Sequence, residues 1–303
     1  MTMMTDLQKR ISELLPGCCL KFNEPMRNHT SFRIGGNAEV MAFPDSGEAL
    51  AQLLKASKTL DIKPAILGAG TNVLAPDEGI AGLVICLKDC LGGMELLPDD
   101  RLMVMGGVTM TRAAVFAANN GLSGLEFAHG IPGTVGGGVF MNAGAYGGEI
   151  CQVCERVCVM DLDGNMRELS GAEMQFSYRH SILEENGGIV VSAVLKLTPG
   201  SPEEIKGRMK ELMAKRSASQ PLDLPSAGSA FKRPVGGYAA ALIDQTGLKG
   251  FQIGGAAVSN KHAGFVVNVE SASAADVRTL LKEVSDRVYE NSGIRLEPEV
   301  RIW

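Results

Sequence analysis

Residues Gly121 to Gly148 read GLSGLEFAHGIPGTVGGGVFMNAGAYGG and contain ten glycines in twenty-eight positions. The chain average of 37 glycines in 303 residues would place about three there. Because glycine has no Cβ, its main-chain N–H groups can come within hydrogen-bonding distance of phosphate oxygens. A flexible linker would be rich in serine and charge, whereas this stretch carries many large apolar residues. The pattern therefore predicts a backbone surface that cradles an anionic group.

The composition is that of an ordinary globular protein. Of 303 residues, 45% are hydrophobic and 21% are charged, which is enough apolar material for a large core and more than one domain. The formal net charge is −5, and lysine and arginine are scattered along the chain, so we expect no nucleic-acid partner. An anionic ligand must therefore be held locally.

The first residues, MTMMTDLQKRISELLPG at positions 1–17, predict a short amphipathic helix. They contain neither the apolar segment nor the cleavage site of a secretion signal, and the sequence has no run of about eighteen apolar residues. We therefore expect a cytoplasmic protein with no membrane role.

The seven cysteines do not suggest a disulfide framework, because the number is odd and Cys18 and Cys19 are adjacent. The spacing of Cys151, Cys154 and Cys158 resembles the start of a metal site. On a strand, however, Cys151 faces one side while Cys154 and Cys158 face the other, so the three thiols cannot converge. We therefore expect buried thiols and no metal.

Strands and helices are both predicted by the spacing of the apolar residues. Runs and alternation predict strands at residues 38–43, 64–67, 83–87, 101–105, 152–161, 166–169, 189–197, 264–269 and 294–303. Helical spacing and caps predict helices at residues 45–61 with an Asp45–Glu48 capping box, 111–120 with Thr111 as N-cap, from Pro202 onward, 239–246, and 274–291 with Gly293 at the end. The elements do not alternate strictly, so we predict an α+β fold rather than a doubly wound one.

A second glycine-containing turn, GAGTN at Gly68–Asn72, follows the predicted strand at 64–67. It differs from a dinucleotide fingerprint because Val73 stands where a third glycine belongs and Pro76 stops a following helix. The segment can still be a phosphate-binding turn, because its main-chain N–H groups, the Thr71 hydroxyl and the Asn72 amide offer several hydrogen-bond donors.

The C-terminal part contains an unusual segment, SAGSAFKRP at Ser226–Pro234. Small residues around Ser229 permit close approach of a ligand, and Lys232 and Arg233 can meet a phosphate or carboxylate. A nucleophile elbow and a bare loop are the alternatives; Phe231 replaces the second glycine of the elbow, and no strand is predicted before it.

Six motifs in sequence order are similar to those of the bacterial UDP-N-acetylenolpyruvoylglucosamine reductase family of cell-wall synthesis. The resemblance spans residues 28–301 and is carried by NHTSFRIGGNAEV, LGAGTNVL, GLEFAHGIPGTVGGGVFMNAGAYGGEI, FSYRHSIL, PSAGSAFKRP and LEPEVR. The first three motifs alone indicate only the wider class of FAD-binding enzymes that resemble vanillyl-alcohol oxidase.

The resemblance implies a flavoenzyme that takes electrons from NADPH through FAD and reduces the enolpyruvyl group of a UDP-sugar to UDP-N-acetylmuramate. Its fold would be a two-lobed FAD-binding module of the PCMH type over residues 1–200, with lobes at about 1–78 and 79–200. A smaller substrate-binding domain would follow at residues 201–303, and its last strand, 294–303, would return towards the active site. We predict no obligatory protein partner.

The resemblance also implies catalytic roles. Arg179 and Glu299 match the pair that stabilises an enolate-like state of the substrate, and Ser229 matches the serine that donates a proton. A serine hydroxyl is a weak acid, so it needs tight geometry and a nearby positive charge, part of which we expect from Lys232. Glu297 is the alternative to Glu299, since both would face one side of the closing strand.

Binding residues follow from the same match. Tyr178, Lys232 and Arg233 are expected to bind substrate, and Arg233 stands where some members carry asparagine. The spacing implies the short variety of the family, without an extra substrate-covering segment. The expected FAD contacts are Arg33, Gly68, Ala69, Gly70, Thr71, Asn72, Ile131, Pro132, Gly133, Thr134, Gly136, Gly137, Asn142, Ala143 and Gly144.

Two other functions compete with this interpretation. An FAD-dependent oxidase of the same class would pass electrons to oxygen, and many such oxidases tether the flavin through a histidine that Gly68–Asn72 lacks. A non-catalytic nucleotide-binding regulator would not require Arg179, Ser229 and Glu299 together.

Overall fold

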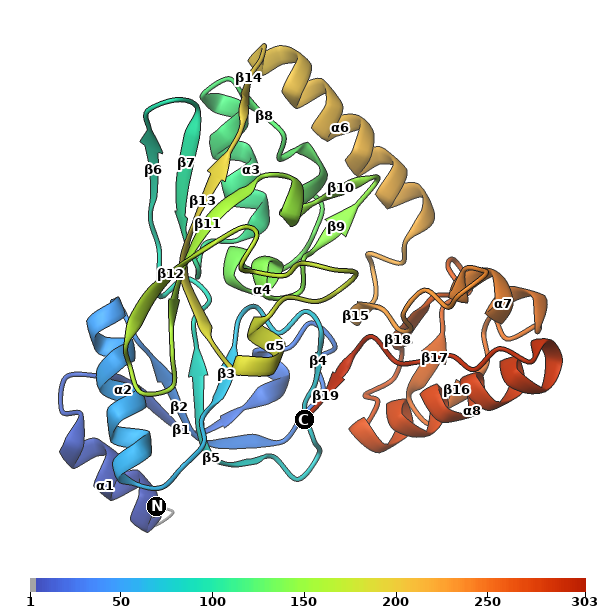
Figure 1. Cartoon of the computed structure of the whole chain (residues 1–303). Coiled ribbons are helices and arrows are strands. Elements are labelled where there is room, and N and C mark those ends of the chain that lie inside the picture. The colour runs from blue at the N-terminus through green and yellow to red at the C-terminus, as the bar shows by residue number, and fades with distance from the viewer. Residues whose placement is uncertain (1–3) are drawn as a thin grey trace. The chain divides into compact units, whose positions relative to one another are not determined.

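The computed structural model describes residues 4–303, and the chain divides into two compact units that each combine distant segments of the sequence (Figure 1). Unit 1 comprises the segment ending at Phe22 together with Val40–Ala69 and Gly82–Lys215. Unit 2 comprises Asn23–Glu39, Gly70–Ala81 and Arg216–Trp303.

A four-stranded sheet and two helices form the first part of the chain. The sheet has the strand order β1-β2-β5-β3, and its strands are β1 (Cys19–Pro25), β2 (Asn37–Phe43), β5 (Ile80–Cys86) and β3 (Ala65–Leu67). Helix α1 (Asp6–Leu14) begins with a capping box of Thr5 and Gln8. Helix α2 (Gly47–Thr59) buries Leu50, Leu53 and Leu54 in a core cluster of unit 1.

Unit 1 also contains a five-stranded antiparallel sheet with the order β12-β11-β13-β7-β6. Its strands are β6 (Met94–Leu97), β7 (Arg101–Met105), β11 (Cys154–Met160), β12 (Met166–Ser170) and β13 (Ile189–Lys196). The central strand β13 is buried along most of its length, which explains its continuous apolar sequence.

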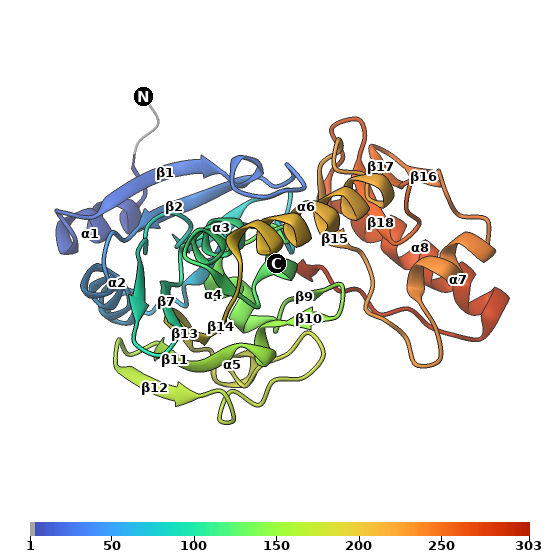
Figure 2. The same cartoon turned by 90° about the horizontal axis from the view of Figure 1, so that it is seen from above.

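The glycine-rich stretch folds into a series of short elements that pack against this sheet. They are β8 (Leu122–Ser123), η2 (Glu126–Ala128), α4 (Val135–Phe140), β9 (Gly144–Ala145) and β10 (Gly148–Glu149), preceded by α3 (Met110–Asn119). Helix α4 contacts β13 and β7 (Figure 2). Unit 1 is completed by η3 (Ile150–Gln152), α5 (Leu183–Asn186), β14 (Thr198–Pro199) and the main part of α6 (Pro202–Ser219).

Unit 2 contains a four-stranded antiparallel sheet covered by two helices. The order is β15-β18-β17-β16, with β15 (Ser226–Ser229), β16 (Gln252–Ile253), β17 (Ala256–Val258) and β18 (Phe265–Asn268). Helix α8 (Ala274–Ser292) contacts β16 and β17, and α7 (Ala239–Gln245) contacts α8. The remaining elements are η1 (Met26–Asn28) and the parallel pair β4 (Val73–Leu74) and β19 (Arg301–Ile302).

The predicted α+β class is confirmed, because the ladders are mostly antiparallel and the helices do not alternate with the strands. Two predicted helix caps are wrong. Ser46, not Asp45, caps α2 by accepting the N–H of Ala49 at 3.1 Å. Thr109, not Thr111, caps α3, because the Thr111 hydroxyl instead donates to the carbonyl oxygen of His129 at 2.8 Å.

The predicted closing strand at 294–303 is also wrong in extent, since only Arg301–Ile302 forms a strand. Pro298 makes a single bridge to Phe231, and the absence of an N–H on proline limits any longer ladder there. Strands β1, β6, β15 and β17 are among those that the sequence patterns did not predict. Within residues 4–303, every helix is too short or too polar to span a lipid bilayer.

Candidate functional site

The turn that follows β3 contacts the N-terminal end of α4 within unit 1. A Cβ added to Gly68 would lie 2.8 Å from Oγ1 of Thr134, so only glycine allows this approach. Thr134 is the N-cap of α4, and its Oγ1 accepts the N–H of Gly137 at 3.2 Å. Two of the predicted cofactor-binding segments, Gly68–Ala69 and Gly133–Thr134, therefore meet in the folded unit.

These two segments present main-chain donors that the protein itself does not use. Among the hydrogen bonds of residues 4–303, none involves the N–H groups of Gly68, Ala69, Gly133 or Thr134. Unpaired N–H groups at a glycine turn and a helix N-terminus are the usual ligands of a diphosphate. The segments thus fit the anionic centre of the expected FAD.

The next glycines of α4 are used in a different way. The N–H of Gly136 donates to the carbonyl oxygen of Gly106 at 2.8 Å, and a Cβ on Gly136 would come within 3.0 Å of that same oxygen. The N–H of Gly137 is held by Thr134. Close packing against Gly106 therefore explains why residue 136 is a glycine. Contact of Gly136 and Gly137 with a cofactor stays a prediction.

Ile131 and Pro132 lie in the loop between η2 and α4. Ile131 packs against the large core cluster of unit 1, whereas Pro132 is exposed. His129, which the sequence did not single out, has a buried Nδ1 without a hydrogen-bond partner among the described residues. A buried orphan nitrogen beside a glycine loop is a further group that a ligand can satisfy.

Asn142 lies at the end of α4 in the left-handed backbone region, with φ +42°. Its side chain is buried and donates from Nδ2 to the main-chain oxygen of Ser177 at 3.0 Å and to Oε2 of Glu149 at 3.1 Å. Its Oδ1 accepts the N–H of Cys151 at 2.9 Å. The predicted FAD contact therefore has both amide hydrogens bound within the protein.

Arg179 lies in the tight hairpin Ser177–His180, whose ends bond to each other through their main chains at 3.1 and 3.2 Å. Its φ of +56° is unusual for a residue with a side chain. The guanidinium donates to the carbonyl oxygen of Gly144 at 3.4 Å and lies 5.4 Å from the ring centre of Tyr178. Unit 1 thus brings together Asn142, Gly144, Tyr178 and Arg179, which the sequence had assigned to separate roles.

In unit 2, the turn Gly70–Asn72 packs against the segment that contains Arg33. A Cβ on Gly70 would come within 2.0 Å of the His29 carbonyl oxygen, and the N–H of Ser31 donates to the Gly70 carbonyl oxygen at 3.0 Å. The Ser31 hydroxyl also donates to the main-chain oxygen of Ser226 at 2.6 Å. Arg33 itself is exposed and has φ +56°.

Ser229 and Glu299 are brought to neighbouring backbone positions in unit 2. Ser229 ends β15, and the next residue, Ala230, accepts the N–H of Glu299 at 2.9 Å. The Ser229 hydroxyl makes no hydrogen bond with another described residue. Asn72 holds the same segment from its other side, because its Nδ2 donates to the Glu299 main-chain oxygen at 3.2 Å. Asn72, predicted as a cofactor contact, therefore also supports Glu299.

Lys232 and Arg233 have partners in unit 2 that the sequence did not predict. The Lys232 ammonium forms an ion pair with the Glu297 carboxylate, so the Lys232 charge expected beside Ser229 is shared with Glu297. The Arg233 guanidinium lies 4.6 Å from the ring centre of Tyr238. Glu297 is exposed and takes part in the ion pair with Lys232, and the match of Glu299 to the family's glutamate stays a prediction.

The three spaced cysteines are not all on one strand, as the sequence argument assumed. Cys151 belongs to η3, whereas Cys154 and Cys158 belong to β11. Burial raises the pKa of the Cys154 thiol to about 12. No group of three or more histidine, cysteine, aspartate or glutamate side chains in residues 4–303 is arranged to hold a metal ion.

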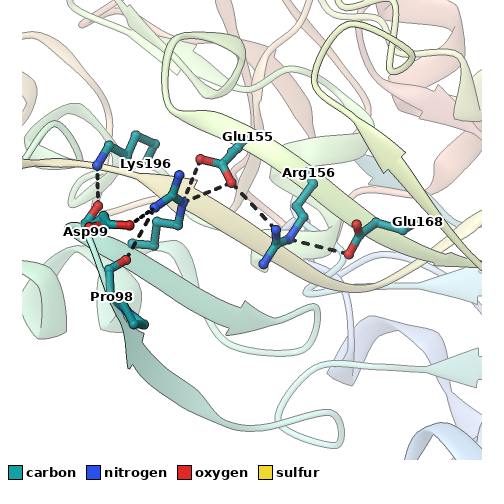
Figure 3. Close-up of polar contacts among 7 residues, drawn as sticks. Pro98, Asp99, Glu155, Arg156, Glu168 and Lys196 are labelled. Carbon is teal, nitrogen blue, oxygen red and sulfur yellow. Dashed lines mark hydrogen bonds and ion pairs between the residues drawn. The ribbon is translucent and has the colours of Figure 1, made fainter.

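Charged side chains of the five-stranded sheet form a row of ion pairs (Figure 3). Arg101, Glu155 and Arg156 of this row also line a cavity of about 330 Å³. Nε of Arg101 lies 2.8 Å from Oε2 of Glu155, and Nε of Arg156 lies 3.4 Å from Oε2 of Glu168. The Lys196 ammonium donates to the main-chain oxygen of Asp99, which also pairs with Arg101 through its side chain. Both arginines that line the cavity are paired with carboxylates, so neither guanidinium is a free cation for an anionic ligand.

The sequence matches two known family models. Residues 220–303 match the C-terminal domain of UDP-N-acetylenolpyruvoylglucosamine reductase, and residues 38–170 match an FAD binding domain. The second match contains both glycine segments of unit 1 described above.

Curated relatives extend over nearly the whole chain. A UDP-N-acetylenolpyruvoylglucosamine reductase of Lactococcus lactis subsp. cremoris is 46% identical over 96% of this chain and 96% of its own length. A protein of the same name from Agathobacter rectalis is 47% identical over 97% of each chain.

Solved structures agree with the fold. UDP-N-acetylenolpyruvylglucosamine reductase from Thermus caldophilus superposes with a TM-score of 0.77 at 35% identity, covering 94% of this chain and 98% of that one. An alkyldihydroxyacetonephosphate synthase shares only the fold, with a TM-score of 0.51 and 15% identity over 66% of this chain and 42% of its own. The predicted class of FAD-binding fold is therefore confirmed.

Proposed function

Since this chain belongs to the UDP-N-acetylenolpyruvoylglucosamine reductase family, we propose that it reduces UDP-N-acetylglucosamine enolpyruvate to UDP-N-acetylmuramate with NADPH. This reaction supplies a precursor of peptidoglycan. The structural observation that supports the proposal is the 2.9 Å bond from the Glu299 N–H to the carbonyl oxygen of Ala230, because Ala230 directly follows Ser229 in the chain.

FAD is the cofactor, and the match of residues 38–170 to an FAD binding domain supports it. Gly68, Ala69, Gly133 and Thr134 would hold its diphosphate through their free N–H groups. When bound, FAD supplies the hydride that adds to the enolpyruvyl double bond. The other predicted contacts, including Arg33, Gly70 and Thr71, belong to the same proposal.

Two side chains would stabilise the substrate as charge moves onto its carboxylate. Arg179 supplies a permanent cation with planar donors, and such a group is most effective when its position is fixed before the reaction. The hairpin Ser177–His180 and the Gly144 carbonyl oxygen fix that position. Glu299 is the partner of Arg179 in this role, and Asn72 and Ala230 hold its main chain.

Ser229 would donate the proton that completes the reduction. Ser229 is the last residue of strand β15. The preceding residue, Gly228, has φ +78°, and a Cβ added to it would meet no atom within 4 Å. A ligand can therefore approach the hydroxyl closely, as a proton transfer requires. Tyr178, Lys232 and Arg233 are proposed to bind the remainder of the substrate.

The domain roles complete the proposal. Residues 1–200 would bind the cofactor, with lobes at about 1–78 and 79–200, and residues 201–303 would bind the UDP-sugar. We place the enzyme in the cytoplasm, with NADPH and the UDP-sugar as its small-molecule partners and no nucleic-acid, membrane or obligatory protein partner.

The two half-reactions test this function. The purified protein should be yellow, NADPH should bleach its flavin anaerobically, and the enolpyruvyl UDP-sugar should restore the colour. An oxidase would instead regain the colour quickly with oxygen but not with the sugar. A colourless protein that binds no added FAD would contradict both enzyme functions and favour a regulator.

A further inference from the structure

The side chain of Asn142 is fully engaged within unit 1. It is 2% exposed, its two amide hydrogens reach Ser177 and Glu149, and its oxygen accepts from Cys151. An amide carries only two donor hydrogens, so none remains for a cofactor. The presence of asparagine at position 142 therefore needs an explanation other than the FAD contact that the sequence predicted.

One of the three Asn142 side-chain bonds reaches the main chain of the hairpin that carries Arg179, and the other two hold the segment at Glu149 and Cys151. Ser177, which accepts one of them, forms the base of the hairpin that carries Arg179 in a left-handed conformation. Gly144, which accepts the Arg179 guanidinium at 3.4 Å, lies two residues after Asn142. Asn142 is thus hydrogen-bonded to the hairpin that carries the guanidinium and is close in sequence to the carbonyl group that accepts from it.

Asparagine suits this position for two reasons. It tolerates a positive φ better than other non-glycine residues, and the observed φ is +42°. Its amide also donates and accepts at once, whereas aspartate of the same shape only accepts when ionised. An aspartate here would face the Glu149 carboxylate as well.

We propose that Asn142 is a positioning residue that holds Arg179 in its working orientation, an inference that rests on the proposed function of Arg179. It does not touch the substrate in this role. The base of the hairpin has a second anchor, because the Ser181 hydroxyl donates to the Phe140 carbonyl oxygen at 2.7 Å. Loss of Asn142 should therefore loosen the hairpin around Arg179 without detaching the segment.

The first test compares the half-reactions of Asn142→Asp and Asn142→Ala with those of the parent enzyme. We expect flavin reduction by NADPH to stay within about threefold, while reoxidation by the enolpyruvyl UDP-sugar slows about tenfold to a hundredfold, the usual effect of a small misplacement. Asn142→Asp keeps the side-chain shape and the acceptor for Cys151, so it serves if the alanine variant does not fold.

Gln152→Ala is the matched control. Gln152 is exposed and makes two hydrogen bonds in the same segment, to the N–H of Glu149 and the carbonyl oxygen of Gly147, both at 3.2 Å, but none to the Arg179 hairpin. Both half-reactions of this variant should match the parent enzyme. Loss of flavin or equal slowing of both half-reactions in Asn142→Asp would overturn the proposal.

A double variant tests whether the effect passes through Arg179. If Asn142 acts only by positioning this guanidinium, Asn142→Asp should cost no further rate when Arg179 is already alanine. Additive losses would show that Asn142 acts independently and would reject the proposal.

Hydrogen exchange of the protein gives a readout that does not depend on activity. Asn142→Asp should speed exchange of the Ser177 and His180 amides, and Gln152→Ala should not. Unchanged exchange would contradict the positioning role. A parent enzyme that the sugar does not reoxidise would instead refute the proposed function, while the exchange result would still decide whether Asn142 holds the hairpin.

Discussion

The side-chain amide nitrogen of Asn72 lies 3.2 Å from the main-chain oxygen of Glu299 and donates a hydrogen bond to it. The two residues are 227 positions apart in the sequence. The Asn72 main-chain oxygen also accepts the N–H of Arg301 at 3.0 Å. One residue of the glycine turn thus fixes the segment that carries the proposed catalytic glutamate.

Replacing Asn72 with alanine should therefore affect the substrate more than the flavin. We expect reoxidation by the enolpyruvyl UDP-sugar to slow by roughly tenfold, because Glu299 loses one of the hydrogen bonds that fix its main chain. Bound flavin, measured by absorbance per protein, should stay near the parent level. Loss of the flavin with unchanged reoxidation of the remaining holoenzyme would show that Asn72 serves the cofactor instead.

Ser229→Ala should separate the half-reactions more sharply. The variant lacks the proposed proton donor, so reoxidation by substrate should slow by roughly a hundredfold or more, while reduction by NADPH stays nearly intact. Ser226→Ala on the same strand is the control and should leave both rates unchanged. Equal slowing of the two half-reactions would mean that Ser229 is structural.

Gly68→Ala should weaken FAD binding. The added Cβ would lie 2.8 Å from Oγ1 of Thr134 and would separate the two donor segments. Overpacking typically costs about 1–3 kcal/mol, and about 1.4 kcal/mol corresponds to a tenfold loss of affinity. Titration of the flavin-free protein with FAD measures this effect. Gly207→Ala in α6, where a Cβ meets no atom within 4 Å, should bind FAD like the parent.

The sequence predicted those helices well for which the capping residues and the spacing of the apolar residues indicate the same bounds. Helix α8 was expected at 274–291, and it occupies Ala274–Ser292 with Gly293 at φ +73°. Neighbouring polar residues were harder to separate, because Thr109 and Thr111 are equally good caps in isolation. The choice depends on the carbonyl group of His129, which lies 18 residues away from Thr111.

The candidate site shows the same limit. The glycine pattern alone predicted Gly68 as a phosphate contact, whereas the roles of Arg179 and Ser229 were predicted only through the resemblance to the family. The roles of Asn72 and Asn142 were not visible, since their amides bond to main-chain atoms 227 and 35 residues away. The orphan Nδ1 of His129 depends on burial, which no local pattern reports.

The His262 imidazole predicts a pH dependence of stability. Burial first, and then the charge of Lys249, lower the pKa of His262 below its ordinary 6.5, and its Nδ1 accepts the N–H of Gly264 at 3.1 Å. The folded protein therefore favours neutral His262, whereas the unfolded chain takes up a proton near pH 6.5. This contribution is complete above pH 6.5 and is lost as the pH falls through the folded pKa.

Urea unfolding between pH 8 and pH 5 measures this effect. The free energy of unfolding should fall more steeply below pH 6.5 in the parent than in His262→Asn, whose Oδ1 can still accept from Gly264 but does not titrate. Parallel curves for the two proteins would show that His262 does not contribute.

Asp77 should stabilise helix α8 from a distant part of the sequence within unit 2. Its carboxylate accepts the N–H groups of Ala274 at 2.7 Å and Ala275 at 3.0 Å, two donors of the first helical turn that the helix itself cannot satisfy. A negative charge there also interacts favourably with the helix dipole. Asp77→Ala should therefore lower the free energy of unfolding by about 1–2 kcal/mol.

Two further variants separate the hydrogen bonds of Asp77 from its charge. Glu78→Ala removes an adjacent, exposed carboxylate and should change the free energy of unfolding by no more than about 0.5 kcal/mol. Asp77→Asn keeps one acceptor oxygen but loses the charge, so its stability should lie between those of the parent and the alanine variant. If Asp77→Ala and Glu78→Ala unfold at the same urea concentration, the carboxylate contributes only to net charge and the capping role is wrong.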